Sequence, residues 1–474
     1  MKNFSNLTIK TAREGLDKKE FTSVELTQYY LDNIKAKDTE IHAYMEVFAD
    51  ALEQAKKADE KIAKGEKGEL LGIPISIKDN ILFLGHKASA SSKMLENYTS
   101  TYTSTGLQKV LDAGAVIIGR TNMDEFAMGS STENSAYGPS KNPNDTSRVP
   151  GGSSGGAAAS LAGAMTLVAL GTDTGGSVRQ PASLCGVVGL MPTYGAVSRY
   201  GIMAMGSSLD QIGPLTKTVT DSEIVFKTLY GVDSFDSTTI DYKISDLPKE
   251  QKLKIGIPTE IMKIDGIDPE VRKNFEESLE KLKTLGHEIV DVSMPNLGYA
   301  LAVYYILMPA EVSSNLARFD GVKYGLHVDG KNIIDDYFKT RHEGFGKEVR
   351  RRILLGTYVL SSGYYDSYYN KANIVRDLIK KDYENAFIKV DAILTPTTPS
   401  PAFKFGSKTA NPLEMYLEDI FTVPVNIAGV PAISIPSGFK EIDGKNLPLG
   451  IQFVAPYRRE DVLFRIGKDF LGEK

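Results

Sequence analysis

Cysteine is almost absent from this chain, and its N-terminus has no apolar segment. Cys185 is the only cysteine among 474 residues, so an intrachain disulfide is impossible. A chain without disulfides is typical of a reducing compartment. The opening residues, MKNFSNLTIKTAREG, lack the apolar stretch of a signal peptide. These two absences predict a cytoplasmic protein.

Long apolar runs and a cationic surplus are also missing. The longest apolar stretch, residues 155–170, is rich in alanine and glycine, and it is shorter than the roughly 18 residues that a membrane-spanning helix needs. We interpret it as a buried helix followed by a buried strand. With 55 Lys and Arg against 60 Asp and Glu, the formal net charge is -5. Proteins that hold a polyanion unaided carry a basic surplus, so this chain is not expected to be the main holder of a nucleic acid.

Strand-like apolar runs alternate with helix signals along the chain, which predicts the α/β class. The capping box of Thr22 and Glu25 marks one helix start, and Asp268 followed by Pro269 marks another. Length alone favours about three domains at roughly 150 residues each, but no linker or repeat divides the sequence, so we expect one domain over residues 1–474. Strands are expected at residues 71–77, 115–119, 254–258, 391–394, 432–435 and 450–454, and helices within 1–66 (the second of two over 43–64), at 268–286, over most of 299–381 and after 458–461.

Glycine and serine are concentrated in residues 151–213, within a core region of about residues 71–215. Ser153 lies in the run Gly-Gly-Ser-Ser-Gly-Gly, and Ser177 lies in Gly-Thr-Asp-Thr-Gly-Gly-Ser-Val-Arg. Apolar segments separate these runs, which is the composition of a packed core rather than of a flexible linker. Because glycine carries no Cβ, successive backbone amides can converge on one point. An oxyanion hole could therefore be formed by the amides of Thr174, Gly175, Gly176 and Ser177.

A serine nucleophile needs a base, and histidine, the usual one, is scarce in this chain. There are only five histidines, none of them within residues 151–213: His42, His86, His287, His327 and His342. Lys78 is the candidate base, because it closes the apolar strand 71–77 and burial can lower a lysine pKa by several units from about 10.4. A neutral Lys78 could take the Ser177 proton directly, or through Ser153, since a hydroxyl both donates and accepts.

Each of these features also has a structural explanation. Glycine-rich runs are more often tight turns, a lysine at a strand end is more often solvated, and Ser153 or Ser154 could cap a helix that begins near Gly155. Only the combination favours a catalytic site. Cys185 has apolar neighbours in the sequence, which favours an inert buried thiol over a cysteine nucleophile.

Two further interpretations use the same glycine-rich segment. Residues 152–156 satisfy the Gly-x-Ser-x-Gly pattern of α/β-hydrolase esterases, but that pattern requires a preceding strand, and residues 145–150 are polar and contain a proline. A non-catalytic module could use the glycine nests to bind phosphate groups. The consensus Gly-x-x-x-x-Gly-Lys-[Ser/Thr] is absent, so we expect no ATP on this chain.

The combination of these motifs resembles the amidase signature family of serine amidases. The similarity covers Lys78 and residues 151–156, 171–182, 185–190 and 208–214. It implies a mixed β-sheet core covered by helices, with Lys78 as the base, Ser153 as a bridging serine on a cis peptide, and Ser177 as the nucleophile. It implies no metal or cofactor on this chain. One departure is Met191, where the family usually has lysine, but this position lies outside the triad.

Three helical segments narrow the resemblance to one branch of the family, the glutaminase subunits of tRNA-dependent amidotransferases. These segments are residues 313–325, 343–353 and 360–369. The branch implies a glutamine pocket to which a helical segment of about residues 299–385 contributes. In that pocket Arg352 would pair with the substrate carboxylate, Asp419 with its ammonium group, and Tyr304 would supply a phenol.

The residues themselves leave these three assignments open. Arg350, Arg351 and Arg352 are consecutive on a predicted helix, where neighbours point about 100° apart. Only one of them is therefore expected to face a pocket, with the other two solvated. Asp419 could equally be a surface acid, and Tyr304 could be a core residue.

The resemblance also implies a reaction and partners. Ser177 would attack the side-chain amide of glutamine, water would release glutamate from a glutamyl ester, and ammonia would pass to a partner. Subunits B and C would complete a heterotrimer in which a partner uses ATP and Mg2+ to convert Glu-tRNA(Gln) to Gln-tRNA(Gln) and holds most of the tRNA(Gln). Whether Asp-tRNA(Asn) is also an acceptor stays open. The alternative is a stand-alone amidase of the same family that acts on another small amide.

Overall fold

The core of the molecule is a single mixed β-sheet. A computed structural model describes residues 3–245, 247–248, 251–260, 264 and 266–473. Its strands are β1 (Tyr44–Val47), β2 (Pro74–Lys78), β3 (Val116–Thr121), β4 (Val168–Asp173), β5 (Val188–Met191), β6 (Gln211–Thr216), β7 (Lys254–Pro258), β8 (Glu288–Val292), β9 (Ala392–Pro396), β10 (Ala432–Ile442) and β11 (Lys445–Val454). They pair in the order β1-β3-β2-β4-β6-β5-β10-β11-β9-β7-β8 as one 11-stranded sheet.

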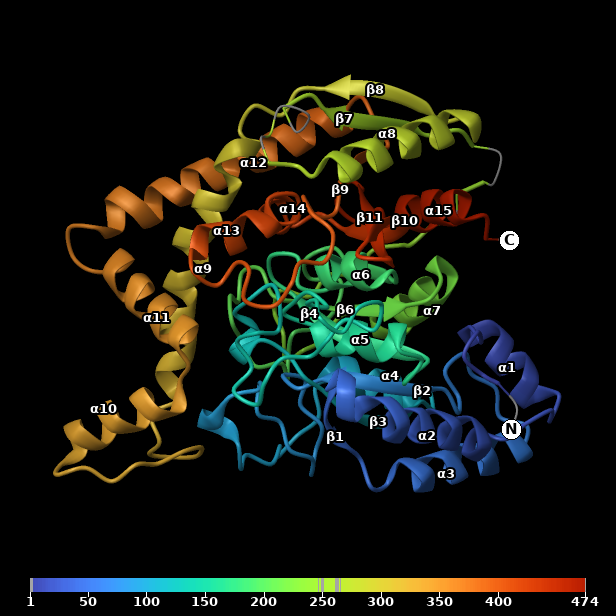
Figure 1. The fold of residues 1–474 in the computed structure, drawn as a ribbon, viewed down its shortest axis with the longest axis horizontal. Coiled ribbons are helices and arrows are strands. Elements are labelled where there is room, and N and C mark those ends of the chain that lie inside the picture. The colour runs from blue at the N-terminus through green and yellow to red at the C-terminus, as the bar shows by residue number, and fades with distance from the viewer. Residues whose placement is uncertain (1–2, 246, 249–250, 261–263, 265, 474) are drawn as a thin grey trace.

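The sheet contains both parallel and antiparallel pairs, with a run of antiparallel pairs from β4 to β9 in its middle. β2 is parallel to β3 and β4, whereas β4 pairs antiparallel with β6. The sheet runs from β1 near the bottom of Figure 1 to β8 at the top, with helices packed around it. The predicted α/β class and the single mixed sheet covered by helices are confirmed, whereas the predicted limits of the regions within the domain stay predictions.

The helices cover the sheet and, on one side, extend away from it. They are α1 (Ile9–Asp17), α2 (Ser23–Ile41), α3 (Ala51–Ala63), α4 (Thr105–Asp112), α5 (Gly155–Ala162), α6 (Arg179–Cys185), α7 (Val219–Leu229), α8 (Pro269–Thr284), α9 (Ala300–Asn315), α10 (Ile333–Gly344), α11 (Lys347–Val359), α12 (Lys371–Phe387), α13 (Pro412–Tyr416), α14 (Val423–Ala428) and α15 (Glu460–Leu471). α10 and α11 project from the left side of the molecule in Figure 1. In the described ranges no helix has the length and apolarity to cross a membrane.

Local signals located several elements correctly. Thr22 and Glu25 form the predicted capping box, with the Glu25 amide 3.0 Å from Thr22 Oγ1 and the Thr22 amide 2.8 Å from Glu25 Oε2. Asp268 caps α8, which begins at Pro269. The longest apolar stretch forms the predicted buried pair, α5 and then β4.

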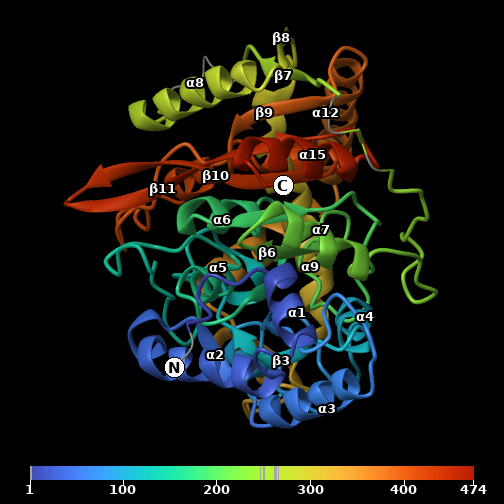
Figure 2. The same ribbon diagram turned by 90° about the vertical axis from the view of Figure 1, so that its right-hand side faces the viewer.

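Tertiary pairing overrode other expectations. The helix predicted over residues 43–64 is wrong at its start, because β1 pairs there with β3 and α3 begins only at Ala51. The strands expected at residues 432–435 and 450–454 are the buried parts of a longer hairpin, β10–β11, which projects to one side in Figure 2. In the outer part of the hairpin β10 is only half-buried, and Gly438, Lys440 and Glu441 interrupt its apolar pattern.

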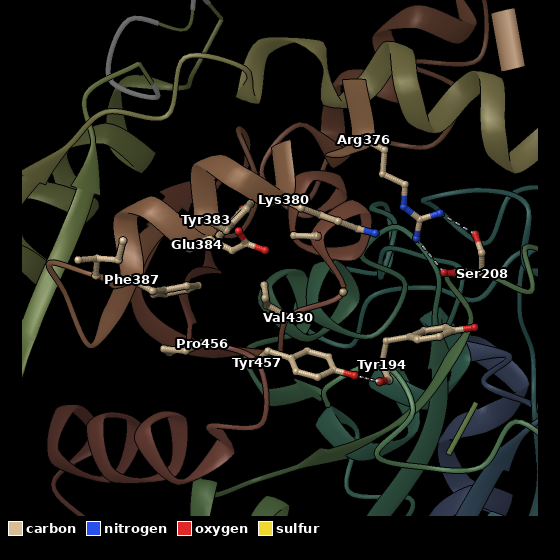
Figure 3. A pocket seen from close by; sticks show the side chains of 13 residues that line it. Tyr194, Ser208, Arg376, Lys380, Tyr383, Glu384, Phe387, Val430, Pro456 and Tyr457 are labelled. Carbon is tan, nitrogen blue, oxygen red and sulfur yellow. Dashed lines mark hydrogen bonds between the residues drawn. The ribbon is translucent and has the colours of Figure 1, made fainter. Parts of the chain in front are cut away.

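A cavity of about 750 Å³ opens beside α12, on residues that the sequence did not single out (Figure 3). A second cavity, of about 390 Å³, lies where α11 meets residues 129–134 and the segment around α13. Arg352 lines the 390 Å³ cavity.

Candidate active site

Lys78 is the last residue of β2 and is completely buried. Its ammonium group donates to Ser153 Oγ at 2.7 Å, to Thr172 Oγ1 at 2.9 Å and to the Thr172 carbonyl at 3.2 Å. Thr172 lies on β4, the strand that runs parallel beside β2. The two neighbouring parallel strands therefore hold the lysine against the serine of the first glycine run.

Burial lowers the pKa of Lys78 to about 7, although the nearby carboxylates of Asp124, Asp173 and Asp210 act in the opposite direction. A large part of the lysine population is therefore neutral near pH 7. A neutral amine with a free lone pair can accept a proton from a hydroxyl, which is the requirement for a general base. The surroundings of Lys78 thus suit the role that the sequence predicted for it.

Ser153 and Ser177 lie on adjoining turns. The Gly152–Ser153 peptide is cis, as the resemblance implied. The Ser154 amide donates to the Ser177 carbonyl at 3.1 Å. Among the described residues, none is hydrogen-bonded to the Ser177 hydroxyl, so the structure joins Lys78 to Ser153 directly and leaves the Ser153–Ser177 relay a prediction. Contacts of this kind often tighten only when substrate is bound.

Ser154 occupies the N-cap position of α5, but its side chain does not cap the helix. Its hydroxyl donates instead to the Thr172 carbonyl at 3.1 Å, and α5 has no side-chain cap. Ser154 therefore links the first glycine run to β4, on which Thr172 also holds Lys78. The hydroxyl group of Ser153 contacts Lys78, and that of Ser154 contacts β4. Neither hydroxyl caps α5.

The glycine loop that carries Ser177 folds around the carboxylate of Asp173. Asp173 Oδ1 accepts from the Gly176 amide at 2.8 Å, and Oδ2 accepts from the Val178 amide at 3.0 Å. The predicted oxyanion hole therefore loses one donor, because the Gly176 amide is already bonded. In the described part of the chain, the amides of Thr174, Gly175 and Ser177 have no protein acceptor, which leaves three donors for a developing oxyanion.

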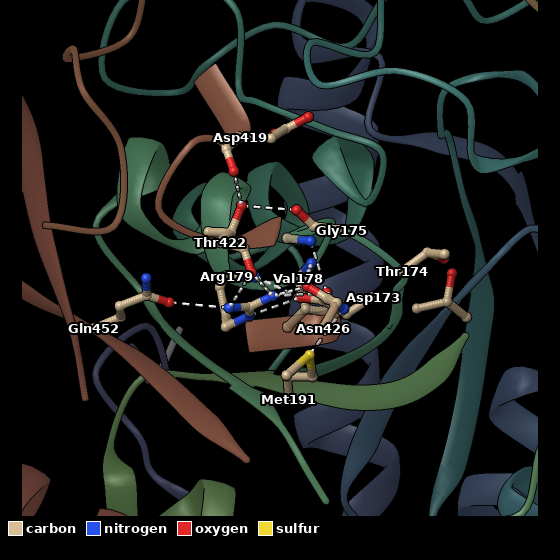
Figure 4. A network of polar contacts seen from close by, with 12 residues as sticks. Asp173, Thr174, Gly175, Val178, Arg179, Met191, Asp419, Thr422, Asn426 and Gln452 are labelled. Carbon is tan, nitrogen blue, oxygen red and sulfur yellow. Dashed lines mark hydrogen bonds and ion pairs between the residues drawn. The ribbon is translucent and has the colours of Figure 1, made fainter. Parts of the chain in front are cut away.

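A buried ion pair holds this loop (Figure 4). The Arg179 guanidinium contacts Asp173 through two bonds of 3.1 Å, and both side chains are fully buried. Burial alone would raise the pKa of Asp173, but the Arg179 charge holds it below its usual range. Arg179 also donates to Gln452 at 3.0 Å and to Asn426 at 2.5 Å. The acceptor that shapes the loop is thereby kept ionised and fixed.

Met191 is closer to the site than its sequence position indicated. Asn426 Nδ2 donates to Asp173 at 2.9 Å and contacts the Met191 sulfur at 3.1 Å. Met191 is fully buried on β5. The residue that departs from the family pattern therefore touches the network that holds the loop, although it lies outside the predicted triad.

Tyr304 lies against the same loop. A Cβ added to Gly175 would lie 2.7 Å from the Tyr304 hydroxyl, so only glycine allows this approach. Gly176 has a φ of +126° and would place a Cβ 2.2 Å from Thr422 Oγ1. Thr422 Oγ1 donates to the Gly175 carbonyl at 2.7 Å. The loop is thus closely packed between α9 and the segment that begins α14.

Asp419 is buried, not a surface acid. Ser130 Oγ donates to its carboxylate at 2.7 Å. Burial raises the pKa of Asp419 to about 8, although the Ser130 hydrogen bond and the charge of Arg352 act in the opposite direction. Gln180 connects this acid to the catalytic turn, since it donates to the Ser130 carbonyl and accepts from the Gly152 amide, both at 2.9 Å. An ammonium group placed beside Asp419 would favour its ionised form.

Arg352 is the buried member of its triplet and lines the 390 Å³ cavity. Its Nε donates to Glu348 at 2.7 Å, and its guanidinium lies 5.5 Å and 5.7 Å from the ring centres of Tyr305 and Tyr416. The prediction that a single arginine faces the pocket is wrong in one detail, because Arg351 also lines this cavity. It is exposed and forms an ion pair with Glu348.

We expect amide hydrolysis at this site to rise with pH. Lys78 is neutral only above its pKa of about 7, and Asp419 is ionised in the free protein only above its pKa of about 8, so both groups give ascending limbs. Measured over about pH 5.5 to 9, kcat should rise once, with the Lys78 pKa of about 7. kcat/KM should rise with both the Lys78 and the Asp419 ionisations. Asp419→Asn should remove the upper limb alone. A kcat that does not change across this range would contradict Lys78 as the base.

The amidase family profile matches residues 25–464. The chain belongs to the amidase family. Among its relatives, the A subunit of the glutamyl-tRNA(Gln) amidotransferase of Thermoanaerobacter pseudethanolicus is 53% identical over 473 residues, which cover 98% of this amidase and 96% of the relative. The protein of the same name from Nostoc sp. is 52% identical over 470 residues, covering 97% and 96%.

Solved structures agree with this assignment. The A subunit of the glutamyl-tRNA(Gln) amidotransferase of Thermotoga maritima matches the amidase with a TM-score of 0.81 and 43% identity, over 98% of this chain and 94% of that one. The native peptide amidase of Stenotrophomonas maltophilia has the same TM-score at 27% identity, over 99% and 97%. The resemblance to the amidase family and to its amidotransferase branch is confirmed.

The rival interpretations find no support in the amidase fold. Residues 145–150 form no strand, so the strand that a Gly-x-Ser-x-Gly nucleophile turn requires is missing before Gly152. The Cys185 thiol is buried, and burial raises its pKa well above the usual range. No group of three or more His, Cys, Asp or Glu residues within the described ranges is arranged to hold a metal ion.

Glu125 is a buried acid of this amidase that the sequence analysis missed. Its carboxylate accepts from Ser92 Oγ at 2.5 Å and from the Gly346 amide at 2.8 Å. Gly346 precedes α11, and a Cβ there would lie 2.4 Å from Glu125 Oε2. Glu125 therefore binds the N-terminus of the helix that carries Arg352. The sequence signal that could have identified Glu125 is the pair of acids Asp124 and Glu125 between the apolar residues Met123 and Phe126.

Replacing Glu125 with alanine should weaken binding of the amide substrate more than it slows chemistry. Loss of the acceptor frees the start of α11, so Arg352 is held less firmly. We expect KM for the amide substrate to rise about tenfold, equivalent to about 1.4 kcal/mol, with little change in kcat. Glu125→Gln keeps an acceptor oxygen for the Gly346 amide and should restore KM. A fall in kcat at unchanged KM would contradict this positioning role.

Proposed function

We propose that this amidase is the glutaminase subunit of a tRNA-dependent amidotransferase. The observation that carries the proposal is a buried guanidinium and a buried carboxyl group beside the Ser177 loop, those of Arg352 and Asp419. Glutamine has a carboxylate and an ammonium group at one end and an amide at the other, so such a pair suits it. Relatives with about half of their residues identical bear the name of the A subunit of glutamyl-tRNA(Gln) amidotransferase.

Substrate binding follows from the contacts of these side chains. Glu348 accepts from Arg352 Nε, and the Met308 sulfur accepts from Nη1 at 3.6 Å. Each terminal nitrogen still has an N–H group for a carboxylate, and a planar guanidinium holds a carboxylate through two parallel bonds. The carboxylate of Asp419 pairs with the ammonium group of the substrate. Tyr304 lies against Gly175, between this end of the pocket and the loop. The side-chain amide then points to Ser177.

The chemistry uses Lys78, Ser153 and Ser177 in series. Ser177 Oγ bonds to the amide carbon while its proton passes through Ser153 to Lys78. The amides of Thr174, Gly175 and Ser177 stabilise the oxyanion. The carbon–nitrogen bond then breaks, Lys78 returns its proton to the departing nitrogen, and ammonia leaves. Water activated by the same pair hydrolyses the glutamyl ester, which releases glutamate and restores Ser177.

Ammonia is the product that the rest of the complex would use. In this proposal subunits B and C complete a heterotrimer, and a partner uses ATP and Mg2+ to convert Glu-tRNA(Gln) to Gln-tRNA(Gln). The partner holds most of the tRNA, consistent with the formal net charge of -5 on this chain. The chain contributes the glutaminase step alone.

Three amides test the substrate assignment. L-glutamine carries both charged groups, 4-carbamoylbutanoate lacks the ammonium group, and 4-aminobutanamide lacks the carboxylate. Asp419→Asn should raise KM for glutamine roughly 10- to 100-fold, as expected for a lost charge-assisted bond, and leave KM for 4-carbamoylbutanoate unchanged. Arg352→Lys should raise KM for both of these. Equal effects of Asp419→Asn on the two substrates would contradict its role at the ammonium group.

The alternative, a stand-alone amidase that acts on another small amide, shares Lys78, Ser153 and Ser177. The three-amide assay separates the two. The glutaminase proposal expects glutamine to be preferred and partner subunits to support amidation of Glu-tRNA(Gln). Rapid turnover of 4-aminobutanamide by the isolated chain, with no preference for glutamine, would favour the stand-alone amidase.

A further inference from the structure

The 750 Å³ cavity is separate from the proposed glutamine pocket. It is lined by one face of α12, by the turn between α14 and β10, and by parts of three loops (Figure 3). None of Lys78, Ser153, Ser177, Arg352 and Asp419 lines it. Its volume lies in the range of ligand-binding cavities, about 300 to 1,000 Å³. The reaction proposed above makes no use of this hollow.

Two cations one helical turn apart on α12 face this hollow. Arg376 donates to Ser208 Oγ at 3.0 Å, to the Ser208 carbonyl at 3.1 Å and to the Ile427 carbonyl at 3.2 Å. All three acceptors are neutral, and among the described residues no carboxylate oxygen lies within 4.0 Å of its guanidinium. The Arg376 charge is therefore hydrogen-bonded but not neutralised.

Lys380 adds a second charge, which forms only a long ion pair. The nearest carboxylate, that of Asp377, is 3.8 Å away and largely exposed. Burial, together with the adjacent Arg376 cation, lowers the pKa of Lys380, although the carboxylates of Asp377 and Glu384 act in the opposite direction. Figure 3 shows its ammonium group pointing to the same side of the hollow as the Arg376 guanidinium. An anion placed between them would relieve their mutual repulsion.

The remaining walls are aromatic and apolar. Phe387 and Pro456 lie at one end, and the rings of Tyr194 and Tyr457 face the cations across the hollow (Figure 3). Ile388, the residue after Phe387, also lines the hollow. Both phenols already donate to backbone carbonyls, of Ser207 at 2.9 Å and of Tyr194 at 3.2 Å. The rings are thus fixed, and they present apolar faces rather than hydroxyl groups.

We propose that this hollow binds an acidic peptide segment from one of the partner proteins of the complex. A carboxylate of the segment lies between Arg376 and Lys380, and a large apolar side chain next to it packs against Phe387, Ile388 and Pro456. The existence of such a partner rests on the function proposed above. The two cations and the apolar walls of the cavity indicate which side chains the segment carries.

The charges favour a peptide over a nucleic acid. A nucleic-acid strand carries a negative charge at every nucleotide and is held by a series of cations. Here there are only two, and Glu384 also lines the hollow a turn beyond Lys380. Glu384 forms an ion pair with Lys381 at 3.1 Å. One carboxylate with an apolar neighbour matches this arrangement, whereas a run of phosphates does not.

Photo-crosslinking in the assembled amidotransferase identifies the occupant. p-Benzoylphenylalanine is placed at Ile388, which is 81% exposed at the apolar end of the hollow, and for comparison at Phe439, which is 66% exposed on β10. We expect the Ile388 probe, and not the Phe439 probe, to link to a partner peptide with Asp or Glu beside a large apolar residue. A link to tRNA, or to a segment without an acid, overturns the proposal.

Affinity measurements test the cations. Lys380→Glu reverses a charge whose nearest carboxylate lies 3.8 Å away, so the fold should persist, and we expect it to weaken partner binding at least about tenfold. Lys371→Glu makes the same reversal on an exposed residue at the start of α12 and should change binding little. Equal binding by both variants overturns the proposal. Failure of the unmodified chain to bind any partner would instead reject the function on which it rests.

Discussion

Replacing Ser177 with alanine will abolish glutamine-dependent amidation and leave ammonia-dependent amidation by the assembled complex intact. Ser177 lies in a loop with three unbonded backbone amides, fixed through Asp173 by a buried arginine. Without its oxygen no glutamyl ester can form. Loss of a serine nucleophile lowers kcat by a factor on the order of a million in the best-studied case, so we expect a fall of at least about a thousandfold in glutamine hydrolysis.

Ser183→Ala is a matched control for this variant. Ser183 is also buried, on α6, and its hydroxyl has no hydrogen-bond partner in the described structure. Its removal should leave both activities close to those of the unmodified protein. Mass spectrometry should detect a glutamyl adduct on Ser177 in the control and none in Ser177→Ala. Loss of both amidation activities in a correctly assembled Ser177→Ala complex would contradict the division of labour between the proteins of the complex.

Replacing Lys78 with methionine should have the second-largest effect. Methionine fills much of the same space and cannot accept a proton. General base catalysis is worth about 100- to 10,000-fold, so we expect glutamine hydrolysis to fall about a thousandfold while ammonia-dependent amidation persists. Lys87→Met, on an exposed lysine of the following loop, should retain full activity. More than about a tenth of the activity in Lys78→Met would exclude Lys78 as the base.

The same variant should be at least as resistant to unfolding as the parent at pH 7. The folded-state pKa of Lys78, about 7, lies below its ordinary value of 10.5, so burial of this lysine costs stability at every pH below 10.5, and the full cost applies below about 7. Methionine removes that cost. Thr172 keeps donors from Asn80 and Ser154. A lower midpoint of thermal unfolding would indicate structural damage rather than loss of a base.

Buried strands and capped helices could be predicted from the sequence because their signals are local. β2 was expected to end at Lys78, and it does. β5 and β6 were missed because glycine and proline interrupt their apolar pattern, and their strand conformation depends on pairing with β4 and β10. β1 was missed because it is a short edge strand that only its pairing with β3 defines.

The motifs predicted Lys78, Ser153 and Ser177, and the family resemblance added Tyr304, Arg352 and Asp419, but the contacts of these residues were not predicted. The sequence offered four backbone donors for an oxyanion, and only folding bonded the Gly176 amide to Asp173. Met191 was treated as remote, yet it contacts Asn426 in the network behind the loop. Glu125 was not singled out at all, because its partner Gly346 is distant in the chain.

The sequence by itself determined the α/β class, the two serine-bearing glycine runs, and the shortage of histidine that pointed to a lysine base. The tertiary structure alone decided which charges are buried and what faces them. Lys78 has a pKa of about 7 because two parallel strands bury it completely. Arg376 and Lys380 share a cavity because α12 packs beside the turn between α14 and β10. Burial and the distances between charges depend on the whole surrounding shell, which no local run of residues contains.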